Sequence, residues 1–179
     1  MRLLSLTLLA AAVLVLPVSA AEVDPKVLVL RQSDVPVGFR LDLDQSGYWS
    51  NAREARHDIR LPTLHERWGR VTGYQVEFDR GRAMISSRAD LFRDAGGARA
   101  FLDWYDRQMR RYLVGILRRA PAPLGREGWV YRTRSPVPFA LVIWREGRIF
   151  AGVEGERVAP DLTLALARIQ QRRITAALR

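Results

Sequence analysis

The sequence has 179 residues, of which 29 are Lys or Arg and 19 are Asp or Glu, so its formal net charge is +10. It contains no cysteine, which excludes disulfide bonds and lipid attachment through a lipobox cysteine. Lys26 is the only lysine, and the arginines are spread along the chain, unlike the clusters of nucleic-acid-binding domains. The basic excess indicates either a surface for polyanions or a general preference for arginine.

The first residues have the features of a secretory signal. Met1-Arg2 precedes an apolar run over residues 3–16, and the small residues Val18-Ser19-Ala20 follow it. This pattern predicts a signal peptide over 1–20, cleaved after Ala20 or at Ala21, and a single domain over 21–179. The run is short for a bilayer span of about 20 residues, so retention as an anchor is the weaker alternative. We expect a secreted or extracytoplasmic protein, in the periplasm or cell envelope, without a stable transmembrane segment after cleavage and without a nucleic-acid partner.

The first part of the domain predicts a short helix and then a strand. Asp24-Pro25 starts a helix over residues 24–32, which Pro36 ends. Residues 39–44 alternate apolar and charged side chains, so Phe39, Leu41 and Leu43 should face the core. A loop over 45–49, a short helix over 51–56 and a long polar surface connection over 57–71 are expected next.

The second part predicts strands in adjacent runs around one long helix. Strands are expected over 73–78, 83–92 and 129–133, the long helix over 95–117, a stiff connector over 120–125 and a last helix over 160–178. Residues 139–144 and 149–153 form a hairpin whose turn is 145–148. The expected fold class is therefore α+β, with an antiparallel sheet of about six strands and helices packed mainly on one face.

The strand over 139–144 should lie in the interior of that sheet. Both of its alternating sets are apolar, Phe139, Leu141 and Ile143 on one side and Ala140, Val142 and Trp144 on the other. A strand with one solvated face would alternate instead. We therefore expect the rest of the chain to cover both of its faces.

Five short segments together resemble a broad group of exported, uncharacterised bacterial proteins, which includes lipoproteins and sensor-type extracytoplasmic domains. The segments are residues 30–39, 73–78, 92–98, 124–127 and 144–149. The resemblance implies a fold similar to the α/β/α sandwich of the PsbP/Mog1 type, and it implies no catalytic residue. The chain departs from the lipoproteins of this group in having no lipobox cysteine.

Two groups of residues are weak metal candidates. Asp42, Asp44 and Ser46, followed by Gly47, match the first half of a calcium loop, but Arg53 occupies the position of the closing carboxylate. The alternative is that both aspartates are outward residues of the strand. His57, His65, Glu54, Asp58 and Glu66 form the second group, which lacks any known zinc motif. We expect no cofactor.

The loop-rich region over 45–72 is the predicted binding face. Tyr48, Trp49, Arg53, Arg67 and Trp68 combine aromatic rings with guanidinium groups, which suits sugars or an anionic envelope polymer. The alternative is that the tryptophans fold back into the core. No nucleophile motif is present. The sequence therefore favours a non-catalytic envelope binding or sensing module, with an anionic polymer or another envelope protein as partner, over a small extracytoplasmic hydrolase with a site near 45–72.

Overall fold

The computed structural model describes residues 23–54, 61–112, 117–133 and 136–179, so the predicted signal peptide lies outside the described residues. Seven strands form one sheet in the order β1-β2-β3-β7-β6-β5-β4, and every neighbouring pair is antiparallel. The strands are β1 (Arg40–Tyr48), β2 (Arg70–Arg80), β3 (Ala83–Phe92), β4 (Leu117–Pro121), β5 (Glu127–Thr133), β6 (Phe139–Glu146) and β7 (Ile149–Glu156).

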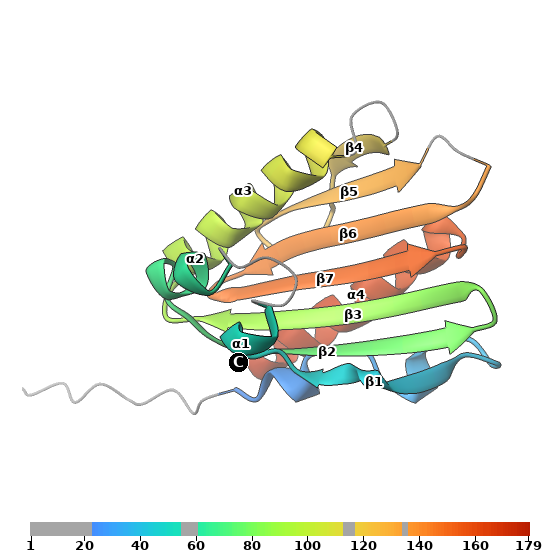
Figure 1. Ribbon diagram of the computed structural model, residues 1–179, viewed down its shortest axis with the longest axis horizontal. Helices are drawn as coiled ribbons and strands as arrows, with labels where there is room; N and C mark the ends of the chain where they lie inside the picture. The colour runs from blue at the N-terminus through green and yellow to red at the C-terminus, as the bar shows by residue number, and fades with distance from the viewer. Residues whose placement is uncertain (1–22, 55–60, 113–116, 134–135) are drawn as a thin grey trace, which may run out of the picture.

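The helices lie on both faces of this sheet. They are the short 3-10 helices η1 (Pro25–Val27) and η2 (Gln32–Asp34) and the α-helices α1 (Asn51–Glu54), α2 (Leu61–Arg67), α3 (Ala95–Tyr112) and α4 (Pro160–Ala177). In Figure 1, α3 crosses the front of the sheet and α4 lies behind it. The predicted α+β class is confirmed, but the two long helices do not share a face.

The hairpin of β6 and β7 lies in the interior of the sheet, and both faces of β6 are covered. Val142 and Trp144 of β6 belong to the apolar cluster on the α4 side, whereas Leu141 and Ile143 belong to the cluster on the α3 side. Each set is apolar, so each face must be shielded from water. The turn is tighter than predicted, because β6 ends at Glu146 and Gly147 adopts a φ of +55°.

Strand β1 is the main correction at the sheet edge. Phe39 is buried as predicted, but Leu41 is 41% exposed and Leu43 is 77% exposed. Leu41 pairs with the buried Phe78 and faces the predicted side of the sheet, whereas the register shift between Asp42 and Gly47 breaks the simple alternation at Leu43. The strand also continues to Tyr48, past the predicted end.

The predicted long surface connection over 57–71 is also corrected in its described part. Residues 61–67 form α2, and β2 begins at Arg70. His65 is fully buried and Arg70 is 7% exposed. Arg70 can be buried because Asp90 and Asn51 accept hydrogen bonds from its guanidinium, and a count of apolar residues does not detect such partners.

The stretch after α3 differs from the prediction as well. The helix ends at Tyr112, and residues 117–121 form β4, the edge strand paired with β5. Almost all of β4 is exposed, so its sequence carries little apolar alternation to mark it as a strand. With β4, the sheet has seven strands instead of the predicted six or so.

Within the described residues, no helix has both the length and the apolar composition needed to span a bilayer.

Candidate ligand-binding site

The α3-side face of the sheet carries a row of polar side chains beyond the cover of α3. Residues that pair directly across strands point to the same face. One such row runs through Asp42, Glu77, Ser86, Glu154 and Leu141, and the next runs through Gln75, Arg88, Gly152 and Ile143. Figure 1 shows no helix in front of the beginning of β3 or the end of β7, the parts of these strands that contain Ser86 and Glu154.

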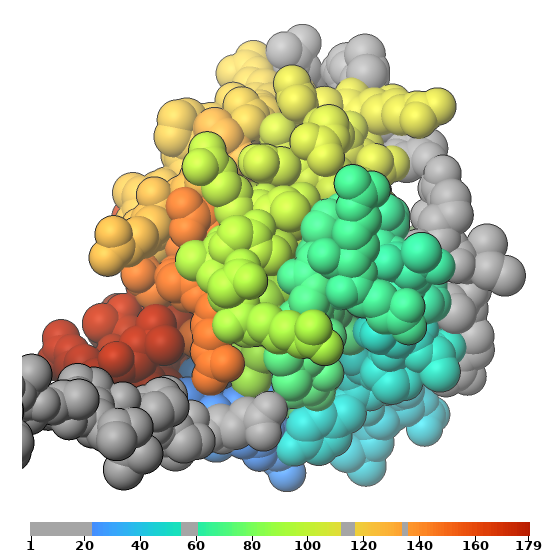
Figure 2. Space-filling view, turned by 90° about the vertical axis from the view of Figure 1, so that its left-hand side faces the viewer, coloured from blue at the N-terminus to red at the C-terminus, as the bar shows by residue number. Residues whose placement is uncertain are grey.

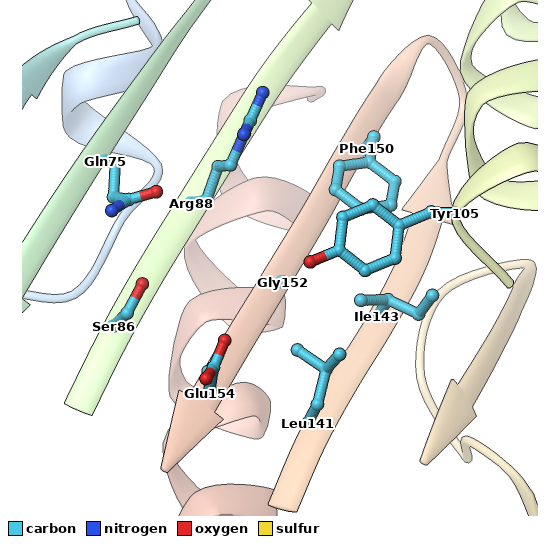
Figure 3. A pocket seen from close by; sticks show the side chains of 9 residues that line it. All are labelled: Gln75, Ser86, Arg88, Tyr105, Leu141, Ile143, Phe150, Gly152 and Glu154. Atoms are coloured by element: carbon cyan, nitrogen blue, oxygen red, sulfur yellow. The ribbon is translucent and has the colours of Figure 1, made fainter. Parts of the chain in front are cut away.

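A pocket opens where the rows meet α3. It holds about 370 Å³ of space free of atoms, part of it open to solvent. Nine residues line it: Gln75, Ser86, Arg88, Tyr105, Leu141, Ile143, Phe150, Gly152 and Glu154. Figure 3 shows the Tyr105 hydroxyl and the Glu154 carboxylate pointing into the same space above Gly152. The pocket therefore combines a carboxylate, a hydroxyl and an apolar floor.

Gly152 leaves the floor of this pocket open. A Cβ added there would lie 3.5 Å from Ile143 Cγ2 and 3.8 Å from the Val142 carbonyl oxygen, both ordinary contact distances. Gly152 thus has room for a side chain, and its backbone does not require glycine. Glycine inside a strand weakens the sheet and often marks the close approach of a ligand or of another segment.

Glu154 has an unusual electrostatic environment. Burial, followed by the negative charges of Glu156 and Glu77, raises the pKa of Glu154 to about 7. Among the described residues, no Arg, Lys or His lies within salt-bridge distance of its carboxylate, and no donor bonds to it. A desolvated carboxylate without a counter-ion costs stability, which is typical of functional sites.

Tyr105 provides the polar group that faces Glu154 from α3. Burial, and then the charge of Glu154, raises the pKa of Tyr105 to about 12, so its hydroxyl stays protonated at neutral pH. Its ring packs against Phe150, with 5.7 Å between the ring centroids, and against Phe101 at 6.0 Å. These contacts fix the ring, so the hydroxyl has a defined position at the pocket.

The positive charge of Arg88 is already neutralised on the other side of the pocket. Arg88 Nε donates to Asp90 Oδ2 at 2.6 Å, and Nη2 donates to Glu54 Oε1. Burial alone would lower the pKa of Arg88, but the charges of Asp90 and Glu54 raise it above its ordinary value. Arg70 shares the same two carboxylates, so the four groups together carry no net charge.

A second acidic group adjoins the pocket at the sheet edge. Asp42, Glu77 and Asp79 bring one carboxylate oxygen each within 4.8 Å of one another. Burial, and then the charges of the neighbouring carboxylates, raises the pKa values of Glu77 and Asp79. Together with Glu154, these carboxylates form an acidic surface that extends toward β1.

The calcium-loop residues make local hydrogen bonds. Asp42 Oδ1 accepts from the backbone N–H of Asp44 at 2.8 Å, and Ser46 Oγ accepts from the Glu77 N–H at 3.0 Å. Arg53 Nη2 donates to the Asp44 carbonyl at 3.2 Å. A guanidinium therefore lies beside the loop in place of a closing carboxylate, which disfavours a cation there. Metal binding by Asp42, Asp44 and Ser46 stays a prediction.

Three of the five predicted binding residues lie near β1. Tyr48 is 54% exposed, and its hydroxyl donates to Asp24 Oδ1 at 3.0 Å. Trp49 is only 7% exposed, and the guanidinium of Arg53 lies 4.5 Å from its ring centroid. Trp49 is therefore part of the folded interior, and Arg53 covers it. The surface available for stacking here is mainly that of Tyr48.

The other two residues, Arg67 and Trp68, lie at the end of α2. The Trp68 ring is 5.9 Å from Trp104 and 5.8 Å from Phe101, so it attaches α2 to α3. Figure 2 shows α2 and the beginning of α3 side by side. Arg67 is exposed. Since Trp49 and Trp68 belong to separate packing groups, binding of one ligand by all five residues stays a prediction.

The described part of residues 45–72 offers no catalytic pair for the hydrolase alternative. His65 Nδ1 lies 3.4 Å from Asn51 Oδ1, and its Nε2 has no hydrogen-bond partner among the residues that the structure describes. Burial, and then the charge of Arg70, lowers the pKa of His65 to about 4, so the ring is neutral. The Ser50 hydroxyl accepts from the Arg53 N–H at 3.2 Å. His57 and Asp58 of the predicted metal group lie outside the described residues.

The pocket was not identified from the sequence, although two signals were present. Gly152 interrupts an apolar strand, and Glu154 extends that strand with a charge after Val153. A glycine or a charged residue in a strand whose other residues are apolar departs from the pattern of a buried strand. Such departures are expected at functional sites. Tyr105 could not be separated from the other apolar residues of its helix by periodicity alone.

The opposite face has a second and larger hollow, with about 670 Å³ of space free of atoms, part of it open to solvent, between η1, η2 and the strands β1 and β2. Its walls are mostly apolar, including Leu41, Val76 and Phe78, and Lys26 and Arg31 lie at its rim. The exposure of Leu41 is explained by this hollow.

Comparison with known proteins supports the fold. No protein-family profile matches the sequence, and no curated protein matches it significantly. The structure is similar to the extracellular domain of PknH from Mycobacterium tuberculosis, with a TM-score of 0.52 and 9% sequence identity over 88% of this chain and 99% of that one. The neighbour is thus an extracellular domain, the class that the sequence resemblance indicated. Identity this low establishes a shared fold alone.

Proposed function

We propose that this protein is a non-catalytic extracytoplasmic module that binds a small ligand in the pocket between β7, β3 and α3. The observation that carries the proposal is the pocket itself: Glu154 and Tyr105 face an open space above Gly152, where a larger residue would fit. Pockets that combine an apolar wall with a few converging polar groups are the usual places for ligands.

Two further observations support the extracytoplasmic part of the proposal. The first residues have the pattern of a secretory signal, and the fold is shared with the extracellular domain of a mycobacterial protein. A fusion of the full chain to a reporter enzyme that is active only outside the cytoplasm tests this location. Activity of the fusion supports export, and activity only with an added signal peptide contradicts it.

The predicted anionic polymer or envelope protein concerns a different surface. The pocket carries Glu154, and the acidic group beside it consists of Asp42, Glu77 and Asp79, so an anionic ligand would be repelled there. Binding of a polyanion by the arginine-rich exterior stays a prediction. The pocket and the exterior can be tested separately, because variants of the pocket floor leave the surface arginines unchanged.

A pocket-filling variant tests the binding site whichever small molecule occupies it. Gly152→Met places a flexible side chain in the pocket, and Gly152→Ala serves as the matched control with a small addition. Both should fold. Thermal unfolding of residues 21–179 is then measured against sugars, amines, lipid headgroups and calcium.

The comparison of wild type and variants decides the result. A ligand at a hundred times its dissociation constant adds about 2.7 kcal/mol of stability, which shifts the midpoint measurably. We expect at least one compound to raise the midpoint of the wild type and of Gly152→Ala but not that of Gly152→Met. Compounds that stabilise all three proteins equally would place binding elsewhere and contradict the proposal.

A further inference from the structure

We propose that the pocket binds the positively charged end of an organic amine or guanidine, with the Glu154 carboxylate as its counter-ion and the apolar floor in contact with its carbon skeleton. This inference rests on the proposed function, since it names the class of ligand for the same pocket. It comes from the balance of charge around the pocket and from the composition of its walls.

Among the described residues, the charge balance around the pocket leaves one acidic group without a partner. Arg88 also lines the pocket, but its guanidinium is held by Asp90 and Glu54. Glu154 has no such partner among the described residues. Within the described part of the chain, the pocket therefore presents one carboxylate without a counter-ion, although the full sequence has a net charge of +10. A cation entering the pocket gains an ion pair in a partly dehydrated site.

The remaining walls select the uncharged part of the ligand. Leu141, Ile143 and Phe150 form an apolar surface next to the carboxylate, and the Tyr105 ring lies beside them. An inorganic cation would leave this surface unused. An alkyl or aryl ammonium group would cover it and would also place its N–H donors near Glu154 and the Tyr105 hydroxyl.

The geometry makes binding dependent on pH. Glu154 is flanked by Ser86 on β3 and Leu141 on β6, which do not titrate near neutral pH. In the part of the chain that the structure describes, the charged and titratable groups that face it are Glu156 on its own strand, Glu77 on β2, Arg88 on β3 and Tyr105 on α3. Of these, the two glutamates oppose its ionisation. Because a cation pairs only with the ionised carboxylate, protonation of Glu154 releases the ligand.

The test compares n-butylammonium with its uncharged isostere 1-butanol by NMR titration of residues 21–179. With a pKa of about 7, the ionised fraction of Glu154 falls about 30-fold between about pH 8.5 and about pH 5.5. We expect the affinity for n-butylammonium to fall by the same factor, with shifts at the resonances of Tyr105 and Gly152. At the higher pH, 1-butanol should bind at least tenfold more weakly, since it forms no ion pair.

Two variants that each remove one negative charge are compared, and the second is the control. Glu154→Gln keeps the shape of the side chain and should weaken n-butylammonium at least tenfold and abolish the pH dependence. Glu66→Gln alters an exposed carboxylate on α2 and should change neither. Equal binding of both probes, or an unchanged affinity in Glu154→Gln, would overturn the cation inference.

The inference and the proposed function fail in different ways. If 1-butanol binds as well as n-butylammonium and Gly152→Met blocks both, the pocket is a ligand site but not for cations. If neither probe shifts the pocket resonances at about pH 8.5, the cation inference is overturned, and the compound panel decides the proposed function independently.

Discussion

Arg70 and Asp90 form a buried ion pair between β2 and β3, directly over Gly73. Arg70 donates to Asp90 Oδ1 from Nε at 2.8 Å and from Nη2 at 2.6 Å. A Cβ on Gly73 would lie 2.1 Å from the same Asp90 oxygen, so only glycine leaves room for the pair. Arg70 Nη1 also reaches Asn51 at the start of α1, at 3.0 Å. This pair therefore holds the α1 segment against the sheet beside the pocket.

Asp90→Asn should strongly destabilise the protein. The charges of Arg70 and Arg88 outweigh the effect of burial and lower the pKa of Asp90 to about 2, which shows how closely both cations depend on it. Removing one partner of a buried pair leaves an uncompensated charge and costs about 3–5 kcal/mol. Urea unfolding measures the loss. Asp161→Asn, at a side chain that is 92% exposed, is the control and should change little. Equal stability of both variants would contradict this account.

Glu154→Gln should stabilise the protein at alkaline pH. The pKa of Glu154 is raised from 4.5 to about 7 in the folded state, so the folded protein retains a proton that the unfolded chain releases. Glu154 therefore lowers stability progressively as the pH rises from about 4.5 to 7. With allowance for its partial exposure, we expect the variant to be about 2 kcal/mol more stable at about pH 8 and equal to wild type near pH 4.

The effect of Glu154 has to be measured as a difference between wild type and Glu154→Gln. This is because the titration of His65 changes the pH dependence of stability in the opposite direction. Its pKa is lowered from 6.5 to about 4, so its contribution to stability is present above about pH 6.5 and is lost as the pH falls. The two effects partly cancel in the wild type. The difference between wild type and Glu154→Gln, measured by urea unfolding across this range, isolates the carboxylate. A difference that does not change with pH would refute the raised pKa.

Much of the fold could be predicted because its signals are local. The two apolar sets of residues 139–144 predicted an interior strand, and the spacing of Phe101 and Leu102 in α3 predicted its buried face. The edge strands β1 and β4 were less predictable, since the bulge after Asp42 and the exposure of β4 remove the alternation on which a strand prediction depends.

The candidate site was not predictable because it depends on pairing between distant strands. Glu77, Ser86 and Glu154 come into one row only through the order β2-β3-β7, which no local pattern specifies. The aromatic and basic residues of 45–72 were prominent in the sequence, yet Trp49 is covered by its neighbours. Charge and aromatic content alone do not distinguish a ligand surface from an internally satisfied network.

Trp49→Ala tests whether this tryptophan is a ligand contact or part of the interior. Trp49 is 7% exposed and its ring lies under Arg53, so removal of the side chain should cost about 3–5 kcal/mol. Tyr48→Ala, at a 54% exposed side chain, is the matched control and should cost much less. Differential scanning calorimetry compares the two. A stable Trp49→Ala protein would instead favour the predicted aromatic binding surface.

The most direct test of the central claim is the titration of the Glu154 carboxyl carbon by NMR, with and without n-butylammonium. We expect a midpoint near pH 7 for the free protein, and a lower midpoint when the cation is bound, because binding of the cation favours the ionised carboxylate. A midpoint in the ordinary range of glutamate, about 4.3, that does not move on addition of the amine would contradict this account.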